Sequence, residues 1–332
     1  MKKIIIDAAS GEQRLDKYLK RYFPNAGMGF LYRMLREKKI KLNNSKSDGR
    51  SILKAGDEID VYFSDDTIKK FMGDSVLSDS QNTIDKVKAD AFRNGIIYED
   101  KDVLLLNKPA GILSQKSRPE DISACELLLN YLYESDQISN EDLKKYKPSA
   151  VNRLDRNTSG MLLCAKTLHA ARELSEIIKN KTVKKEYMAL VKNRMEKAYD
   201  INAFLKKNHS DNMVKISSVK KEGYDRIETS FEAVGYLGND TLLRVDLKTG
   251  KTHQIRAQLS YMGHPIIGDE KYGDKRINKL YFDRYRLKRQ FLHAYRITFP
   301  KKLDYLKAVQ GRSFEAELPN ELKILEGDIR YV

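Results

Sequence analysis

The sequence of 332 residues contains no tryptophan and only two cysteines, Cys125 and Cys164. Two cysteines so far apart supply neither a disulfide framework nor the paired spacing of a zinc site, and they are expected to be small core residues. The five histidines show no HxH or HExxH spacing. We therefore predict that the protein holds no metal and needs no cofactor.

Long apolar runs are missing as well. No stretch approaches the roughly 18 apolar residues that a membrane span requires. Near the start, Asp7 interrupts an apolar run of three residues, which is too short for a secretory signal. These absences predict a cytoplasmic protein with no membrane partner, and we expect it to be monomeric.

Basic residues, in contrast, are abundant. The chain has 62 Lys and Arg against 47 Asp and Glu, a net charge of +15. Such an excess is typical of proteins that bind a polyanion such as nucleic acid, although a basic surface can also serve solubility alone. Residues 1–64 hold 14 Lys and Arg against 8 Asp and Glu, a net charge of +6. This distribution predicts a basic head followed by a larger body.

The head is predicted to be a small α/β domain. Residues 15–23 have the apolar spacing of a helix, and a second helix fits residues 29–38. Residues 40–42 and 59–62 alternate like short strands, and Gly56-Asp57 forms a turn before the second of them. The pattern resembles the S-four-like RNA-binding domain, which is found fused to many RNA enzymes. The matching features are Arg14-Leu15-Asp16, the basic second helix, residues 38–43 and the Gly56-Asp57 turn.

This resemblance implies that cationic side chains of the head bind structured RNA. A solvated helix face is the alternative explanation for such a run of charge. The head residues predicted to contact RNA are Arg14, Lys17, Arg33, Arg36, Lys38, Lys39 and Lys41.

Residues 65–92 are polar, with a Ser/Asp/Asn cluster at residues 78–82, and are predicted to be a linker with at most one helical turn. Residues 93–332 are predicted to form the body, with one helix at residues 168–178 and a helical surface excursion at residues 134–147. Strands that follow one another directly favour an α+β fold, built on a mixed, largely antiparallel sheet with flanking helices and a central cleft. The predicted strands are residues 96–98, 103–106, 161–164, 187–191, 242–247 and 295–299.

Two polar stretches of the body carry residues that could do chemistry. Residues 152–160 place Asp155 between two arginines in a loop rich in Asn, Thr, Ser and Gly, a composition that an ordinary turn would also have. Residues 250–259 open a predicted helix in which Ile255 and Leu259 face inward, and residues 263–269 follow it. Arg256 in this helix needs an anionic partner if it is buried, or else backbone carbonyl acceptors.

These two stretches, together with Asn107–Gly111, residues 185–191 and residues 292–295, resemble the pseudouridine synthases of the large-subunit ribosomal (Rlu) branch. All five occur in the order of that family and cover about residues 96–300. The Arg-Leu-Asp-Arg and Thr-His-Gln-Ile-Arg blocks are the most specific of them. Two residues depart from the family pattern, which usually has His in place of Asn152 and Arg in place of Lys251, and these departures concern fine positioning.

The resemblance implies an RNA pseudouridine synthase with Asp155 as nucleophile, Tyr187 stacking on the target base and Arg256 as partner of the Asp. A carboxylate suits nucleophilic catalysis, and an arginine beside it favours the ionised form. A flipped base needs a stacking surface, whereas a tyrosine with an ordinary pKa near ~10 is a poor base. Further RNA contacts are predicted at Arg153, Arg156 and His253.

Other functions stay open at this point. A non-catalytic RNA-binding or ribosome-assembly factor could retain the same fold, and transfer RNA is an alternative to ribosomal RNA as substrate. A glycosidase that uses Asp155 would commonly need a second, protonated carboxyl group, which the Asp155 block does not supply. Neither the target uridine nor the atom that Asp155 attacks, on the sugar or on the base, follows from the sequence.

Overall fold

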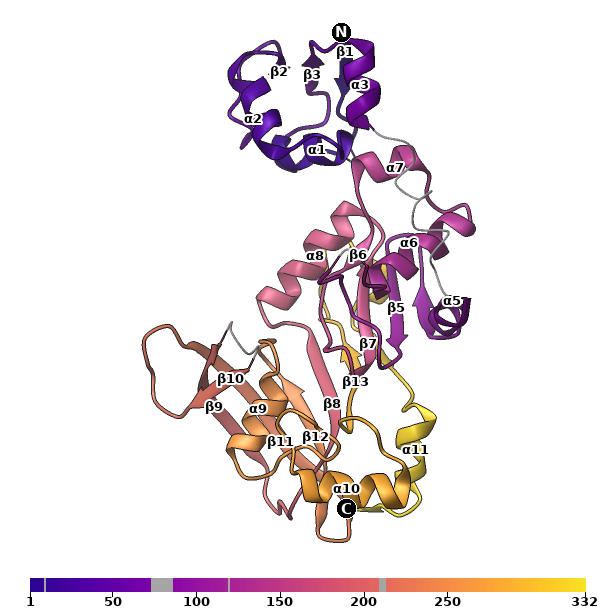
Figure 1. Cartoon of the computed structure of the whole chain (residues 1–332), viewed down its shortest axis with the longest axis vertical. Coiled ribbons are helices and arrows are strands. Elements are labelled where there is room, and N and C mark those ends of the chain that lie inside the picture. Colours follow the sequence, from indigo (N-terminus) through magenta and orange to yellow (C-terminus); the bar gives the residue numbers. More distant parts are fainter. Residues whose placement is uncertain (9, 73–85, 119, 209–212) are drawn as a thin grey trace.

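The basic head forms a packed unit of its own at one end of the molecule (Figure 1). The computed structural model describes residues 1–8, 10–72, 86–118, 120–208 and 213–332. In the head, strands pair antiparallel in the order β1-β3-β2, and Leu15, Leu19 and Leu35 are buried beneath them. The head elements are β1 (Lys2–Ile5), α1 (Leu15–Tyr22), α2 (Met28–Arg36), β2 (Ile40–Leu42) and β3 (Glu58–Val61).

Strand β1 was not predicted, because its apolar run is short and ends at Asp7. It forms because pairing with β3, in which Lys2 lies opposite Val61, buries Ile4 between the sheet and the helices. Tertiary contact therefore creates a strand from a segment that has little local signal.

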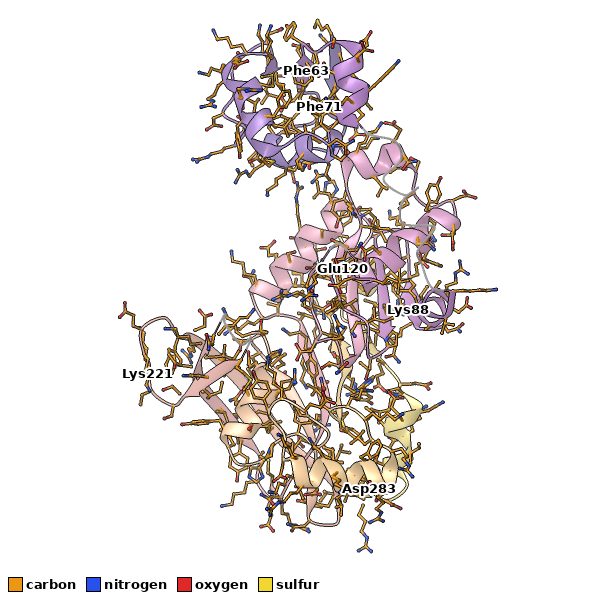
Figure 2. The ribbon with its side chains drawn as sticks, in the orientation of Figure 1. Phe63, Phe71, Lys88, Glu120, Lys221 and Asp283 are labelled. Atoms are coloured by element: carbon orange, nitrogen blue, oxygen red, sulfur yellow. The ribbon has the colours of Figure 1, made fainter. Side chains whose placement is uncertain are left out.

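The packed head continues beyond the predicted boundary at residue 64. Helix α3 (Asp65–Met72) buries Ile68 in the head core, and the ring centroid of Phe71 lies 4.6 Å from that of Phe30. Figure 2 labels Phe63 and Phe71 inside the head. Residues 86–92 of the predicted linker belong to helix α5 (Lys86–Asn94), which buries Phe92 in the body core. Residues 73–85, with the predicted cluster at 78–82, lie outside the described residues.

The body is built on a sheet of twelve strands, counted over the described residues. Its main path is β10-β9-β11-β12-β8-β13-β7-β5-β4, with β6, β14 and β15 pairing to its members. The pair β13–β7 is parallel and the other recorded pairs are antiparallel. The predicted α+β fold with a mixed, largely antiparallel sheet is confirmed. The strands are β4 (Ile96–Glu99), β5 (Val103–Lys108), β6 (Ser149–Ala150), β7 (Ser159–Ala165), β8 (Lys184–Val191), β9 (Tyr199–Lys207), β10 (Val214–Ser217), β11 (Asp225–Leu237), β12 (Asp240–Leu247), β13 (Leu292–Thr298), β14 (Ser313–Glu315) and β15 (Arg330–Tyr331).

The helices of the body flank this sheet (Figure 1). The helix predicted at residues 168–178 is α8, and the one predicted after residue 250 is α9, in which Ile255 and Leu259 are buried as expected. Over the described ranges, no helix combines the length and the apolar character that crossing a membrane requires. The helices are α6 (Ala124–Glu134), α7 (Asn140–Lys145), α8 (Leu168–Lys179), α9 (Gln254–Tyr261), α10 (Lys275–Tyr285), η1 (Lys307–Val309) and α11 (Asn320–Glu326).

The charged excursion at residues 134–147 contains α7, which contacts the head. Its Leu143 is buried, and Lys145 forms a 2.7 Å ion pair with Asp7. On α8, Arg172 forms an ion pair with Glu12 of the head and donates a hydrogen bond to the Gly11 carbonyl. The excursion is therefore a contact between head and body, and not only a solvated surface helix.

Candidate active site

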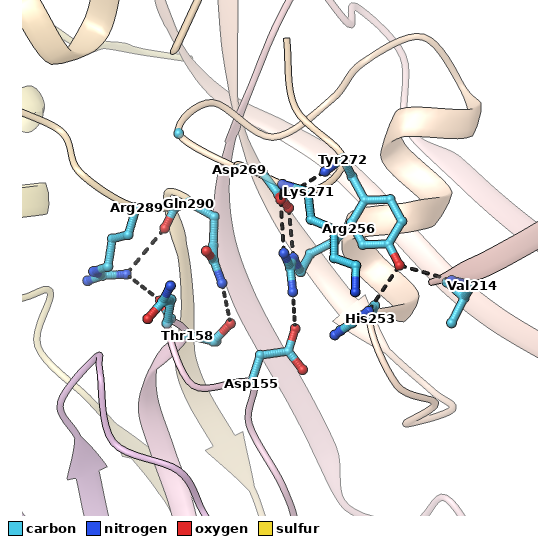
Figure 3. Close-up of polar contacts among 12 residues, drawn as sticks. Asp155, Thr158, Val214, His253, Arg256, Asp269, Lys271, Tyr272, Arg289 and Gln290 are labelled. Carbon is cyan, nitrogen blue, oxygen red and sulfur yellow. Dashed lines mark hydrogen bonds and ion pairs between the residues drawn. The ribbon is translucent and has the colours of Figure 1, made fainter. Parts of the chain in front are cut away.

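Asp155, labelled in Figure 3, lies in the loop of residues 151–158, which leads into strand β7. The Thr158 N–H donates to the Asp155 carbonyl at 3.0 Å, which closes a turn around the aspartate. The Asn152 side chain accepts from the Leu163 N–H at 2.7 Å and thereby fixes the start of the loop to β7. Asn152, one of the two departures from the family pattern, thus has a defined bonding role in this chain.

The guanidinium of Arg256 joins two carboxylates. Its Nη1 donates to Asp155 Oδ2 at 2.7 Å, while Nε and Nη2 donate to the two oxygens of Asp269 at 2.7 and 2.9 Å. The Arg256 side chain is 9% exposed and that of Asp269 is 0%, whereas that of Asp155 is 24% exposed. Arg256 is therefore anchored on one side by two hydrogen bonds to the buried Asp269. On its other side it holds the carboxylate of Asp155, which is partly accessible (Figure 3).

The charges of this cluster stabilise one another. Burial alone would raise the pKa of Asp269, but the hydrogen bonds and charge of Arg256 outweigh burial and lower it. Burial would likewise lower the pKa of Arg256, and Asp269, followed by Asp155, raises it instead. Asp269 Oδ1 also accepts the backbone N–H groups of Lys271 and Tyr272 at 2.9 and 3.0 Å. Asp269 is therefore held as an anion.

Tyr187 reaches the same region through the sheet register. On β8 it lies opposite Ala294 of β13, and Ala294 lies beside Gly160 of β7, five residues after Asp155. Gly160 has φ +109°, and a Cβ there would lie 2.3 Å from the Ala294 carbonyl oxygen, so only glycine permits this approach of β7 to β13. Burial, followed by the charge of Asp155, raises the pKa of Tyr187. Its hydroxyl therefore stays protonated in the free protein.

The segment before β13 supports the Asp155 loop from a second side. Arg289 donates to the Asn157 carbonyl and to Ser159 Oγ, both at 3.1 Å, and Gln290 donates to Thr158 Oγ1 at 3.3 Å. His293 is fully buried between Ser159 Oγ and the Ala316 carbonyl, each at 2.9 Å. Burial lowers the pKa of His293 to about 4, so the ring is neutral. These contacts give His293, in the block at residues 292–295, a structural role, because its ring bridges the Ser159 hydroxyl and the Ala316 carbonyl.

Lys108, from the predicted Lys-Pro stretch, is fully buried below the loop. Its Nζ donates to the carbonyls of Ile112, Pro109 and Arg156 at 2.8, 2.9 and 3.3 Å. Burial lowers the pKa of Lys108 to about 7, with Arg289 adding to the effect and Asp155 opposing it. Three carbonyl acceptors match the three N–H donors of an ammonium group, so the geometry favours the charged form. Lys108 thus ties the Asp155 loop to the end of β5.

His253 caps α9 in a left-handed conformation, with φ 54°. Its Nδ1 forms a 3.0 Å hydrogen bond with the Tyr272 hydroxyl, which also accepts from the Val214 N–H of β10 at 3.0 Å. The Tyr272 ring centroid lies 5.3 Å from the Arg256 guanidinium carbon. Tyr272 therefore connects the β9–β10 hairpin to the Asp155–Arg256 cluster.

The residues predicted to bind RNA differ in exposure and in whether an acidic side chain lies beside them. Arg153 is exposed, and Arg156 is 57% exposed with Asp121 at 3.6 Å. In the head, Arg14 is partly neutralised by Asp16 at 2.5 Å, and Lys41 lies 5.1 Å from the Tyr62 ring centroid. The other head cations predicted to contact RNA, Lys17, Arg33, Arg36, Lys38 and Lys39, are all exposed. Lys251, the second departure from the family pattern, forms a 2.8 Å ion pair with Asp225 at the start of β11.

Sequence reasoning missed the roles of Asp269, Arg289 and Tyr272. A buried arginine called for an anion, and Asp269 stands at the end of the stretch 263–269 that was singled out, so this partner could have been proposed. Arg289 and Tyr272 had no local signal, since one contacts a loop 132 residues away and the other a distant hairpin. Within the part of the chain that the structure describes, no group of three or more His, Cys, Asp or Glu side chains is placed to hold a metal ion.

Comparison with known proteins gives a consistent result. The family model described as RNA pseudouridylate synthase matches residues 102–261. A Haemophilus influenzae protein named ribosomal large subunit pseudouridine synthase C is 32% identical over 338 aligned residues, covering 99% of this chain and 95% of that protein. The Escherichia coli protein of the same name is 31% identical over 306 residues, covering 90% of this chain and 88% of that protein.

Solved structures share the fold. Human RNA pseudouridylate synthase domain containing 4 has a TM-score of 0.59 at 20% identity, covering 74% of this chain and 97% of that one. Human RNA pseudouridylate synthase domain containing 1 has a TM-score of 0.52 at 22% identity, covering 72% and 88%. At these identities the likeness concerns the fold alone.

Proposed function

The chain belongs to the RNA pseudouridylate synthase family and is an isomerase, and on this premise we propose that Asp155 is its nucleophile and that its targets are uridines of large-subunit ribosomal RNA. The observation that carries the proposal is the Asp155 carboxylate, accessible on one side and fixed by the buried Arg256–Asp269 pair on the other. A nucleophile needs this combination of access and orientation.

The reaction balances within the nucleoside. The bond from N1 of uracil to the anomeric carbon breaks, a bond from C5 to that carbon forms, C5 loses its proton and N1 takes one up. No electron or group is exchanged with a second reactant, so the proposal requires no cofactor. Arg256 orients Asp155 toward the flipped nucleoside through its 2.7 Å charge-assisted hydrogen bond.

We assign Tyr187 to stacking on the flipped base. Its pKa is raised by burial and by the Asp155 charge, so the tyrosine is a poor acceptor for the C5 proton in the free protein. A base for that step would require the carboxylate of Asp155, a water molecule, or a changed Tyr187 environment in the complex.

A glycosidase is less well supported than an isomerase. Asp269 brings a second carboxylate near Asp155, which the sequence did not suggest. However, a glycosidase needs a protonated carboxyl group as its acid. The pKa of Asp269 is lowered by Arg256 in spite of burial, and both its oxygens accept hydrogen bonds. Asp269 is therefore unsuited to donate a proton.

The substrate is proposed from the names of the relatives together with the basic head. The H. influenzae and E. coli proteins are named for the large ribosomal subunit. We propose that the head is an S-four-like RNA-binding domain, and that the protein works as a cytoplasmic monomer. Transfer RNA remains the alternative substrate, and mapping pseudouridines in both RNA classes from cells with and without the protein distinguishes the two.

The test of the catalytic assignment is Asp155→Asn. This change keeps the size of the side chain and replaces the anion with a neutral amide. Tritium release from C5-labelled uridine in a ribosomal RNA fragment should fall by many orders of magnitude, while RNA affinity stays within a few fold, because affinity resides mainly in phosphate contacts. A folded variant that forms pseudouridine at near the parent rate would show that Asp155 is not the nucleophile. A parent protein that binds RNA and forms no pseudouridine would favour a non-catalytic binding factor.

A further inference from the structure

Helix α10 (Lys275–Tyr285) and the three residues after it form the most basic short segment of the body. Residues 275–288 contain six Lys or Arg and one acidic residue, Asp283. All six of these cations are exposed. Figure 1 shows α10 at the end of the body opposite the head, with β7, β8 and β13 between them, and Figure 2 labels Asp283 on this helix. The helix reaches the Asp155–Arg256 cluster through Asn278, whose side chain donates to the Asp269 carbonyl at 2.9 Å and accepts from the Gly268 N–H at 2.7 Å.

A pocket of about 690 Å³ lies between α10 and the β11–β12 hairpin. Three arginines line it, Arg284 from α10, Arg194 from the connection after β8, and Arg330 from β15. Three tyrosines, Tyr236, Tyr281 and Tyr285, also line it, and Tyr281 is buried. The pocket therefore combines planar cations with ring faces.

The arginines keep much of their surface exposed, whereas the acids of the pocket already accept hydrogen bonds from neighbouring groups. Asp240 accepts from the Tyr281 hydroxyl at 2.6 Å and from the Asn193 N–H at 3.0 Å. Asp328 accepts from the Tyr285 hydroxyl at 2.7 Å and from Arg284 at 3.2 Å. The side chain of Arg284 nevertheless remains 67% exposed.

The positive charges of the other two arginines, Arg194 and Arg330, are less neutralised by nearby carboxylates. Arg194 is 48% exposed, its carboxylate neighbour Glu196 lies at 3.7 Å, and its guanidinium carbon is 4.0 Å from the Tyr236 ring centroid. Arg330 is exposed and lies opposite Tyr236 in the β11–β15 pair. Tyr236 therefore has arginines from two different segments beside it.

We propose that this α10 pocket is a second RNA-binding surface of the enzyme, in which the arginines contact backbone phosphates and the tyrosine rings stack on an unpaired base. Arginine suits this task because its planar fork bonds two phosphate oxygens and stacks on rings. Aromatic faces accept any base, since every base has a π-face. The inference rests on the proposed function, because the RNA bound here is the substrate that reaches Asp155.

The positions of the head and of α10 in the molecule suggest how the α10 pocket would be used. The head lies at one end of the molecule and α10 at the other, and between them lies β7, the strand that follows the Asp155 loop (Figure 1). A long structured RNA can contact both ends, whereas a short stem-loop centred on the target uridine reaches fewer of these cations. The α10 pocket should therefore matter more for long RNA than for short RNA.

The test uses the full chain with Arg284→Ala and Arg330→Ala combined. Binding to a long ribosomal RNA fragment is measured over a range of salt concentrations. Loss of two phosphate contacts should reduce the slope of log affinity against log salt by roughly 1.5 in magnitude. At saturating RNA, kcat should stay at the parent value while KM rises. The matched control is Lys301→Ala with Lys302→Ala, which removes two exposed charges from the loop after β13.

Two further variants separate charge from stacking. Asp328→Asn frees Arg284 from its carboxylate and should strengthen binding and steepen the salt slope. Tyr236→Leu keeps every charge but removes a ring, so affinity should fall roughly tenfold with little change in slope. Thermal melting confirms that each variant is folded.

The proposal is overturned if the Arg284/Arg330 variant binds long RNA with the affinity and salt slope of the Lys301/Lys302 control, in which case an acidic protein becomes the better candidate for the pocket. The outcome is independent of the Asp155 assignment. Pseudouridine formation by the parent decides the proposed function, whereas the comparison of salt slopes decides the α10 pocket.

Discussion

Replacing Asp269 with Asn should destabilise the protein far more than the same change at Asp155. Both carboxylates bond Arg256, but Asp269 is fully buried and bidentate, whereas Asp155 is 24% exposed and gives one contact. An amide at position 269 offers one acceptor and turns its N–H donors toward the guanidinium. Removing one partner of a buried pair costs about 3–5 kcal/mol because a charge is left uncompensated.

For a catalytic body of this size, each kcal/mol shifts Tm by about 2–4 °C, so Asp269→Asn should melt roughly 6–20 °C below the parent. Asp155→Asn leaves the Arg256–Asp269 pair intact. A partly exposed contact contributes about 1 kcal/mol or less, so its Tm should stay within about 4 °C of the parent. Thermal melting followed by circular dichroism measures both shifts under the same conditions.

The dependence on pH provides an independent check. The folded-state pKa of Asp269 is lowered by Arg256 in spite of burial, so its stabilisation is fully present above the unfolded value near ~3.9 and is lost as pH falls through the folded value. The difference in stability between parent and Asp269→Asn should therefore shrink below about pH 4. Equal melting shifts for Asp269→Asn and Asp155→Asn at neutral pH would refute the claim that Arg256 is anchored by Asp269.

Three other outcomes are expected. Because burial lowers the pKa of His293 to about 4, the unfolded chain binds a proton that the folded one rejects, so the parent should lose up to about 3 kcal/mol of unfolding free energy as pH falls from 6.5 to 4, and His293→Gln should lose less in chemical denaturation over this range. Removal of residues 1–72, cut after α3 so that the head core is not divided, should leave a folded body whose RNA affinity depends less steeply on salt; an unchanged slope would mean that the basic head is only a solvated surface. Excess chelator should leave isomerisation of a prefolded RNA fragment unchanged, and a loss that zinc alone restores would contradict the predicted absence of a metal.

The sequence determined the features that depend on local pattern. Apolar runs such as residues 103–106 and 161–164 predicted buried strands, and both segments are completely buried in β5 and β7. Spacing in the chain also placed Ile255 and Leu259 on the inner face of α9. The family resemblance pointed to Asp155 and Arg256, which the fold brings to 2.7 Å. Local periodicity and motifs suffice for such features because each depends on a few neighbouring residues.

Other elements depended on partners that the local pattern does not name. Strand β1 forms because it pairs with β3. Helix α3 belongs to the head because Ile68 and Phe71 pack against the head core, although the residues around them are polar. Periodicity shows which face of a segment is apolar, but not which surface will cover it.

Only the tertiary structure decided what holds the site together. The parallel pairing of β7 with β13 brings Arg289 and Gln290 to the Asp155 loop across more than 100 residues of sequence. The end of α9 and the segment after it place Asp269 against Arg256. The same arginine therefore bonds the buried Asp269 and the accessible Asp155. These contacts are long-range, and strand order and register select them. The sequence could therefore name Asp155 and Arg256 as candidates for the reaction, while packing alone set their burial and their orientation.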